Sequence, residues 1–156
     1  MIRLQFSSDG TWGDIAIRDY TWSRWGHVEF LLDDGTLLGT RPQHYTVNGV
    51  VVPSGMQIRP AGYTHFRDLA ICTVPGLNAE QEAKILSFAK AQIGTAYNWL
   101  ADAGCAAHED WSTPGTWQCG MVTHASFMEA YPLLYQPRYN RVTPEDLWES
   151  PLIVHP

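Results

Sequence analysis

The chain has 156 residues, a hydrophobic fraction of 45% and a formal net charge of −6, so we expect a single domain over residues 1–156 with one substantial core. Its Lys and Arg residues form no basic run, which disfavours nucleic acid as a partner. The N-terminus lacks the apolar core of a signal peptide and no apolar stretch reaches bilayer-spanning length. We therefore expect a cytoplasmic protein without stable membrane insertion.

The first seventy-five residues are strand-like. Short apolar runs alternate with turn signals such as Asn48-Gly49, a pattern typical of β-structure. The clearest strand, residues 25–32, leads through an Asp-Gly turn into residues 36–38 and predicts a hairpin over residues 27–40. The other short apolar runs of this half lie at residues 13–17, 50–52 and 69–74.

The second half changes to helical spacing. Asn78, followed by acidic residues, predicts the start of a helix that ends at Gly94. A second helix is predicted from Cys119, where a loop rich in Gly, Ser and Thr gives way to apolar residues at helical spacing. The tail, residues 142–147, predicts a short capped helical turn with Pro144 in its first turn. These elements predict an α+β fold in which an antiparallel, barrel-like sheet packs against helices, including the Cys119 helix.

The three cysteines show neither a paired framework nor a Cys-x-x-Cys spacing, so we expect no disulfide and no metal site. Cys119 stands where a loop becomes a helix, and the free N–H groups there lower the pKa of a thiol and could hold an oxyanion. This placement favours Cys119 as a nucleophile, the alternative being a buried structural cysteine. Cys72 lies in an apolar strand and is interpreted as a core residue, and Cys105 has no base nearby in the sequence.

A cysteine nucleophile needs an imidazole to accept its proton, and His27 has the most informative setting among six histidines. The two-residue period of a strand places His27 and Glu29 on one face. A carboxylate there would hold the tautomer of the imidazole, whereas the alternative is an ordinary surface pair. His124 follows Cys119 by five positions and should turn away from it on the helix, as a surface or packing residue.

The order of these residues is a histidine on a strand, then Tyr97, then a cysteine at a helix start, which is the reverse of papain. This order, with the strand motif His27-Val28-Glu29 and the aromatic-x-Cys turn Trp117-Gln118-Cys119-Gly120, resembles the circularly permuted branch of the NlpC-type cell-wall peptidase superfamily. That branch includes the YiiX- and YebB-like bacterial proteins and, more distantly, the lecithin:retinol acyltransferase family. The matching segments are residues 13–17, 23–30, 34–35, 38–42, 92–99 and 117–120.

The resemblance implies a permuted papain-like fold with Cys119 as nucleophile and His27 as base. It implies that Tyr97 lies near the nucleophile, where it helps to stabilise the oxyanion together with the backbone of Gly120. The alternative for Tyr97 is a core ring behind the helix.

The chain departs from the pattern in three places. The family commonly has Cys-Ser-Glu where this chain has Cys-Gly-Met, and Asp after the tyrosine where this chain has Asn98. Related enzymes often take a third polar group from the next strand, near Gly39, where this chain has no ionisable side chain. Glu29 is the first candidate for that group, with His44 or Gln43 as alternatives.

We therefore expect a cofactor-independent cysteine hydrolase, an amidase or peptidase that cleaves peptidoglycan-type peptides or other amides through an acyl-enzyme. One alternative is a lipid-directed acyltransferase or thioesterase-like enzyme, and another is a non-catalytic binding or structural protein with the same fold. The expected partner is a small-molecule, peptide or acyl substrate.

Overall fold

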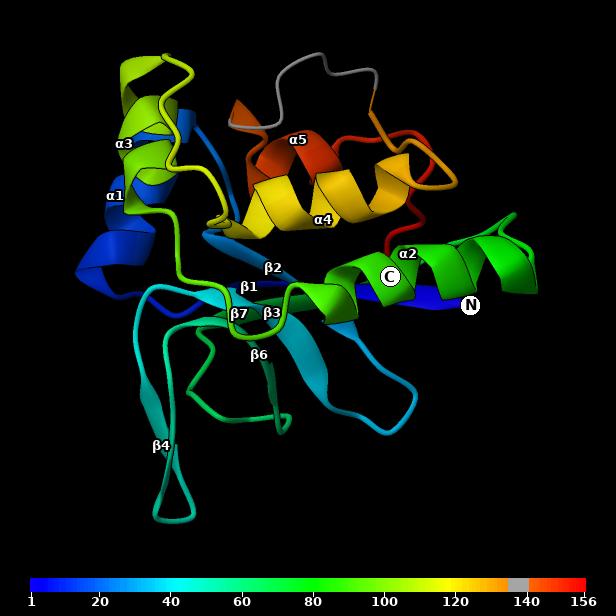
Figure 1. Ribbon diagram of the computed structural model, residues 1–156. Helices are drawn as coiled ribbons and strands as arrows, with labels where there is room; N and C mark the ends of the chain where they lie inside the picture. The colour runs from blue at the N-terminus through cyan, green and yellow to red at the C-terminus, as the bar shows by residue number, and fades with distance from the viewer. Residues whose placement is uncertain (135–140) are drawn as a thin grey trace.

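The computed structural model describes residues 1–134 and 141–156. Its main sheet has five antiparallel strands in the order β6-β3-β2-β1-β7. These strands are β1 (Ile2–Ser8), β2 (His27–Leu31), β3 (Leu37–Arg41), β6 (Gly55–Arg59) and β7 (Asp68–Val74). A separate hairpin of β4 (Tyr45–Val47) and β5 (Val50–Val52) projects away from the body of the molecule (Figure 1).

The helices of the described residues lie mainly on one side of the sheet. They are α1 (Trp12–Thr21), α2 (Ala79–Ala91), α3 (Trp99–Ala107), α4 (Cys119–Met128) and α5 (Pro144–Trp148). Figure 1 shows α2, α4 and α5 over one face of the sheet, while α1 and α3 stand together at one end. None of these helices is long and apolar enough to cross a membrane.

Strand β2 is the middle strand of the sheet and separates two kinds of environment. Its side chains alternate between the faces, so Val28 and Phe30 enter the apolar core whereas His27 and Glu29 lie on the opposite face. Phe30 stacks on Phe127 of α4 at a ring distance of 5.9 Å. The core therefore anchors α4 to the strand that carries both predicted polar residues.

Helix α4 is buried on all sides. Every residue from Cys119 to Phe127 is buried, as expected of a central helix rather than an amphipathic one. A Cβ atom at Gly120 would lie 2.0 Å from the carbonyl oxygen of Val142. Glycine is therefore required for the first turn of α4 to approach the chain that precedes α5.

Most expected elements are confirmed. The hairpin of β2 and β3, strands β5 and β7, and helices α2, α4 and α5 lie where the patterns indicated. Asn78 forms a capping box with Gln81 at the start of α2. That helix ends at Ala91, and Gly94 lies beyond it with a φ of 91°.

Two expectations need correction. Residues 13–17 belong to α1, not to β-structure, because Thr11 caps that helix by accepting a hydrogen bond from the backbone N–H of Asp14. The apolar run at residues 13–17 is too short for its spacing to distinguish a helix from a strand, and the Thr11 cap favours the helix. The sheet also has edges at β6 and β7, so the expected closure into a barrel is not seen in the part of the chain that the structure describes.

Candidate functional site

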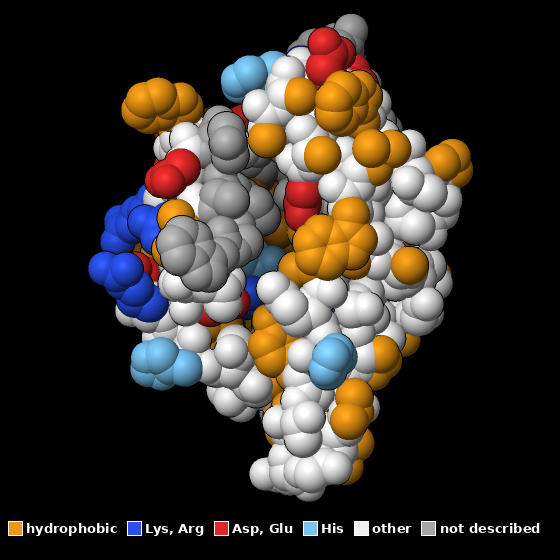
Figure 2. All heavy atoms as spheres, turned by 90° about the vertical axis from the view of Figure 1, so that its left-hand side faces the viewer, with side chains coloured by type: hydrophobic (Ala, Val, Ile, Leu, Met, Phe, Trp, Pro, Cys, Tyr) orange, Lys and Arg blue, Asp and Glu red, His pale blue; other side chains and the backbone are white. Residues whose placement is uncertain are grey.

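A cavity of about 520 Å³ opens where the ends of β2 and β3 face α1 and α3. In Figure 2 this face is hollowed, and side chains coloured as His and as Lys or Arg are visible in the depth of the hollow. The residues that line the cavity and enter the argument below are Asp9, Asp14, His27, Arg41, Gln43, Tyr97, Trp99, Asp102, Ala103, Cys105, Ala106 and Gln118. The cavity therefore joins His27 and Tyr97 of the predicted site with the residue that precedes Cys119.

Cys119 is the first residue of α4 and is 1% exposed. Its helix is capped by the side chain of Gln118, which accepts a hydrogen bond of 2.9 Å from the N–H of Met121. Backbone hydrogen bonds from Val28 and Gly120 reach the thiol. The sulfur thus lies beside the residue that follows His27 in the chain.

The expected low pKa of Cys119 is wrong for this structure. Burial, and next the negative charge of Asp102, raise the pKa of the thiol to about 12. The backbone groups of Val28 and Gly120 and the charge of Arg41 lower it by less. A helix N-terminus stabilises a thiolate only in part, and here the cost of burying the charge is larger.

His27 begins β2 and forms part of the cavity wall. Its Nε2 atom lies 3.5 Å from Oε1 of Glu29, which confirms that the two residues share a face. Burial and the charge of Arg41 lower the pKa of His27 to about 4, against the opposing effect of Glu29. The imidazole is therefore neutral at neutral pH and able to accept a proton.

Glu29 is fully buried and surrounded by hydrogen-bond donors and cations. The hydroxyl of Tyr63 donates to its Oε2 atom at 2.9 Å, Arg41 lies at 3.5 Å and Arg59 at 3.8 Å. Burial alone would raise the pKa of this carboxyl, yet His27, Arg41 and Arg59 together lower it to about 2. The carboxylate is thus ionised and held in place on the face of β2 that carries His27.

Gly39 makes room for that carboxylate. A Cβ atom at Gly39 of β3 would lie 2.5 Å from Cγ of Glu29 and 2.9 Å from its Oε1. The Glu29 side chain therefore occupies the space over Gly39, the position near which the sequence resemblance implied a third polar group. Of the three candidates for that group, Gln43 lines the cavity and His44 is exposed, while Glu29 is the one that contacts His27.

Tyr97 is buried next to the segment that leads into Cys119. It forms a parallel bridge with Trp117, whose N–H donates to the carbonyl of Ala96 at 3.1 Å. Its hydroxyl donates to Oδ2 of Asp102 at 2.8 Å. Tyr97 thus lies near Cys119, as expected, and its hydroxyl contacts the carboxyl group of Asp102, which the sequence analysis did not select.

Asp102 and Arg41 are the charged groups that sequence reasoning missed. Burial raises the pKa of Asp102 to about 6, although the hydrogen bond from Tyr97 lowers it. A local signal for Asp102 did exist, because Asn98 caps α3 and so places Asp102 one turn into a helix that starts beside Tyr97. No local signal marks Arg41, which reaches Glu29 and Asp9 only through the fold.

Asn98, the residue after Tyr97, ties α3 to the loop before Cys119. Its side-chain oxygen accepts from the N–H of Ala101 at 3.0 Å, while its amide nitrogen donates to Ser112 at 2.8 Å and to the carbonyls of Thr113 and Thr116 at 3.4 Å. This set requires both an acceptor and a donor in one side chain. The amide is therefore suited to this position in a way that a carboxylate is not.

The remaining candidates fall outside the Cys119 and His27 arrangement. Cys72 is a core residue, as predicted. His124 is buried within α4, which fits a packing role. Cys105 is buried on α3 and lines the cavity, and burial raises the pKa of its thiol to about 12.

Comparison with solved structures finds a similar fold. The chain matches the crystal structure of the metalloprotein YiiX from Escherichia coli O157:H7 with a TM-score of 0.64 and 16% sequence identity, over 99% of this chain and 94% of that one. No family model matches the sequence, and no curated protein matches it.

Because YiiX is a metalloprotein, we looked for groups in this chain that could bind a metal ion. Among residues 1–134 and 141–156, no group of three or more His, Cys, Asp or Glu side chains is arranged to hold a metal ion. The groups beside the His27 and Glu29 pair are the guanidinium groups of Arg41 and Arg59, whose charge opposes a further cation. The described residues therefore do not fit a metal at this pair.

The likeness to YiiX extends over nearly the whole of both chains, although few residues are identical. Similarity at this level establishes a common fold and leaves the chemistry to be argued from the site. The chain therefore has the YiiX-like fold that the resemblance of its motifs predicted.

Proposed function

We propose that the chain is a cysteine hydrolase, an amidase or peptidase, in which Cys119 attacks a carbonyl carbon and His27 accepts the thiol proton. The observation that carries the proposal is the contact of the Cys119 sulfur with the backbone of Val28, the residue next to His27. Gln118, next to Cys119, and His27 line the same cavity. A substrate carbonyl beside His27 in the cavity would therefore lie close to the start of α4, where Cys119 lies behind the cavity wall.

The resting charges place transfer of the proton within the attack on the carbonyl and not before it. A high thiol pKa and a low imidazole pKa leave both groups neutral at pH 7. As the sulfur forms its bond to the carbonyl carbon, the thiol proton passes to His27, and the carbonyl oxygen becomes an oxyanion. Collapse expels the amine, which takes the proton from His27, and water then hydrolyses the acyl-enzyme by the same steps.

Glu29 acts on His27 and not on the substrate. Its contact with Nε2 leaves Nδ1 as the ring nitrogen for the thiol. The carboxylate stabilises the imidazolium that forms during attack, which matters more when burial disfavours that cation. The N–H of Gly120 and the hydroxyl of Tyr97 are the candidate donors to the oxyanion.

An acylated substrate is the second candidate, and the wall formed by α3 favours it. Ala103 and Ala106 give that wall an apolar surface, and Trp99, 61% exposed, stands at its rim. Figure 2 shows hydrophobic side chains gathered on one side of the hollow. Such a wall fits an alkyl or aromatic group, as in a lipid-directed acyltransferase or thioesterase that uses the same thiol.

The test compares variants on two kinds of substrate, soluble peptidoglycan fragments and p-nitrophenyl esters of short and long acids. Cys119→Ala and His27→Ala should each remove nearly all turnover, and the double variant should be little worse than either, because the two residues act in one step. Cys72→Ala is the control and should lose stability without changing the chemistry. Additive losses, or turnover that survives Cys119→Ala, would contradict the proposal.

A further inference from the structure

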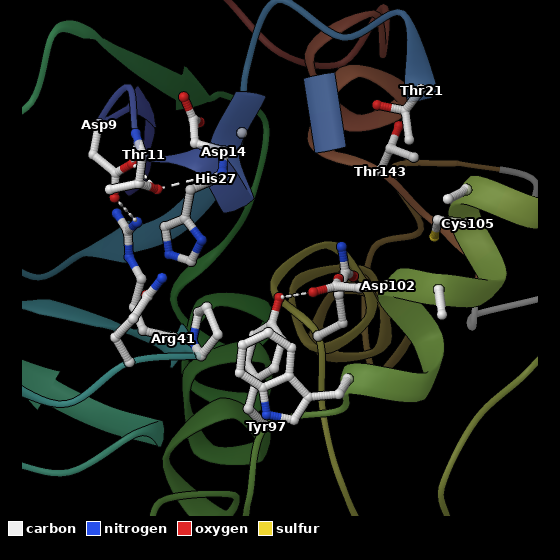
Figure 3. A pocket seen from close by; sticks show the side chains of 17 residues that line it. Asp9, Thr11, Asp14, Thr21, His27, Arg41, Tyr97, Asp102, Cys105 and Thr143 are labelled. Atoms are coloured by element: carbon white, nitrogen blue, oxygen red, sulfur yellow. Dashed lines mark hydrogen bonds and ion pairs between the residues drawn. The ribbon is translucent and has the colours of Figure 1, made fainter. Parts of the chain in front are cut away.

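Asp102 is a half-buried carboxyl group that lines the cavity beside Tyr97. It comes from the first turn of α3, lines the cavity and accepts the hydrogen bond of Tyr97 at 2.8 Å. In Figure 3 the two side chains point toward one another. The proposed reaction as described above gives Asp102 no part, although its charge acts on the thiol of Cys119.

An ionised Asp102 opposes the proposed reaction in two ways. A carboxylate only accepts hydrogen bonds, so the single hydroxyl proton of Tyr97 is committed to it and is withheld from an oxyanion. The negative charge of Asp102 is also the largest influence after burial that disfavours the thiolate of Cys119. Protonation removes the charge, and a neutral carboxyl can donate to the Tyr97 oxygen, which frees the Tyr97 hydroxyl to turn toward the substrate.

We propose, on the basis of the proposed function, that Asp102 is a protonation-dependent positioning residue. When ionised it holds the Tyr97 hydroxyl and disfavours the Cys119 thiolate, and when protonated it does neither. The carboxyl does not touch the reacting atoms. It acts through the Tyr97 hydroxyl and through its field at the sulfur.

The charges around Asp102 allow this titration. Arg41 is paired with Asp9 at 3.4 Å and with Glu29 at 3.5 Å, and Arg18 lies 3.8 Å from Asp14, so each cation already has an acidic partner. The groups that line the cavity or act on its thiols and on Tyr97 are Asp14 from α1, Asp9 from the chain after β1, His27 from β2, Arg41 from β3, Tyr97, Cys119 from α4 and Cys105 from α3. Asp110, Arg141 and Asp146 lie around Cys105.

The two titrations define an interval of pH. Burial keeps Asp102 protonated up to a pKa of about 6, and burial keeps His27 neutral, as a base must be, down to a pKa of about 4. Between about pH 4 and pH 6, Asp102 is therefore protonated while His27 is neutral, which is the combination that favours the proposed reaction. We expect turnover to be highest there and to fall several-fold as Asp102 ionises.

The experiment measures two rates in the full chain between pH 4 and pH 9. The first is alkylation of Cys119 by iodoacetamide, followed by mass spectrometry of the peptide that contains it, and the second is turnover of a p-nitrophenyl ester. Asp102→Asn keeps the size and the acceptor but carries no charge. It should retain turnover above pH 6, and it should raise alkylation at pH 8 several-fold, about tenfold for each unit by which the thiol pKa falls.

Asp33→Asn, at an exposed site in the turn after β2, is the matched control and should change neither profile. Unchanged profiles in Asp102→Asn would overturn the proposal. If no turnover is found with any substrate, the proposed function fails, and the alkylation profile alone decides the role of Asp102. If Asp102→Asn does not fold, carbon NMR of the wild-type carboxyl replaces it: titration near pH 6 together with a change at the Tyr97 ring supports the proposal, and titration below about pH 4.5 overturns it.

Discussion

The carboxylate of Glu29 occupies space that is free because Gly39 has no side chain. Gly39 offers an open position on β3, and the carboxylate of Glu29 extends from β2 into that position. There it meets His27 and the two buried cations, Arg41 and Arg59. A buried charge is stable only when paired and hydrogen-bonded, and each member of this cluster depends on the others.

Glu29→Gln tests that dependence. The amide removes the counter-charge that Arg41 and Arg59 share, although Arg41 keeps its pairing with Asp9. We expect the free energy of unfolding to fall by about 3 kcal/mol. Glu29 raises the pKa of His27 through its charge and hydrogen bond, so its loss should lower that pKa and reduce turnover. Urea unfolding and an NMR titration of His27 measure the two effects. Glu80→Gln, at an exposed site paired with Lys84, is the control, and an unchanged His27 pKa would direct attention to Gln43.

At the scale of elements, the start of α3 and the loop before α4 are joined by one amide. The backbone of Asn98 donates to Trp117 at 3.0 Å, and its side chain donates to the carbonyls of Thr113 and Thr116. The loop is thereby held beside the first turn of α4. The position of Cys119 thus depends on contacts made about twenty residues earlier in the chain.

Asn98→Asp replaces the amide by a carboxylate of nearly the same shape. A carboxylate cannot donate to carbonyl oxygens, and a buried negative charge next to them is repelled, so we expect a loss of about 2 kcal/mol or more in stability. Urea unfolding measures this loss, and turnover should fall with it. Asn48→Asp, in the exposed turn between β4 and β5, is the control. Equal stability of the two variants would show that the donor is dispensable.

At the scale of the whole molecule, the buried His27 and the half-buried Asp102 link stability to pH with opposite signs. The pKa of His27 is lowered from 6.5 to about 4, so its contribution is present above pH 6.5 and is lost as the pH falls toward 4. The pKa of Asp102 is raised from 3.8 to about 6, so the folded state binds its proton first and gains stability as the pH falls through that range. Each effect amounts to about 3 kcal/mol, and the two nearly cancel.

Stability of the wild-type chain should therefore change little through these two groups between pH 6.5 and pH 4. Asp102→Asn removes the compensating group, and its free energy of unfolding should fall by about 3 kcal/mol over the same interval. Urea unfolding at pH 6.5, 5 and 4 measures both curves. Parallel curves for the two proteins would mean that Asp102 does not titrate in this range.

The amino-acid sequence by itself determined the features that depend on a few neighbouring residues. Asn78 and Gln81 cap α2, the Asp-Gly turn joins β2 to β3, and the period of β2 places His27 beside Glu29. Caps, turns and alternation act within about four residues of the chain, so their signals are readable without the fold.

Only the tertiary structure decided the charge state of the site. Burial of Cys119 outweighs the helix N-terminus, and Arg41 and Tyr63 reach Glu29 from segments 12 and 34 residues away. The edges of the sheet and the effect of the Asp102 charge on the Cys119 thiol likewise depend on how distant segments pack. Desolvation and charge interactions are set by what surrounds a group in space, and that information is absent from its neighbours in the chain.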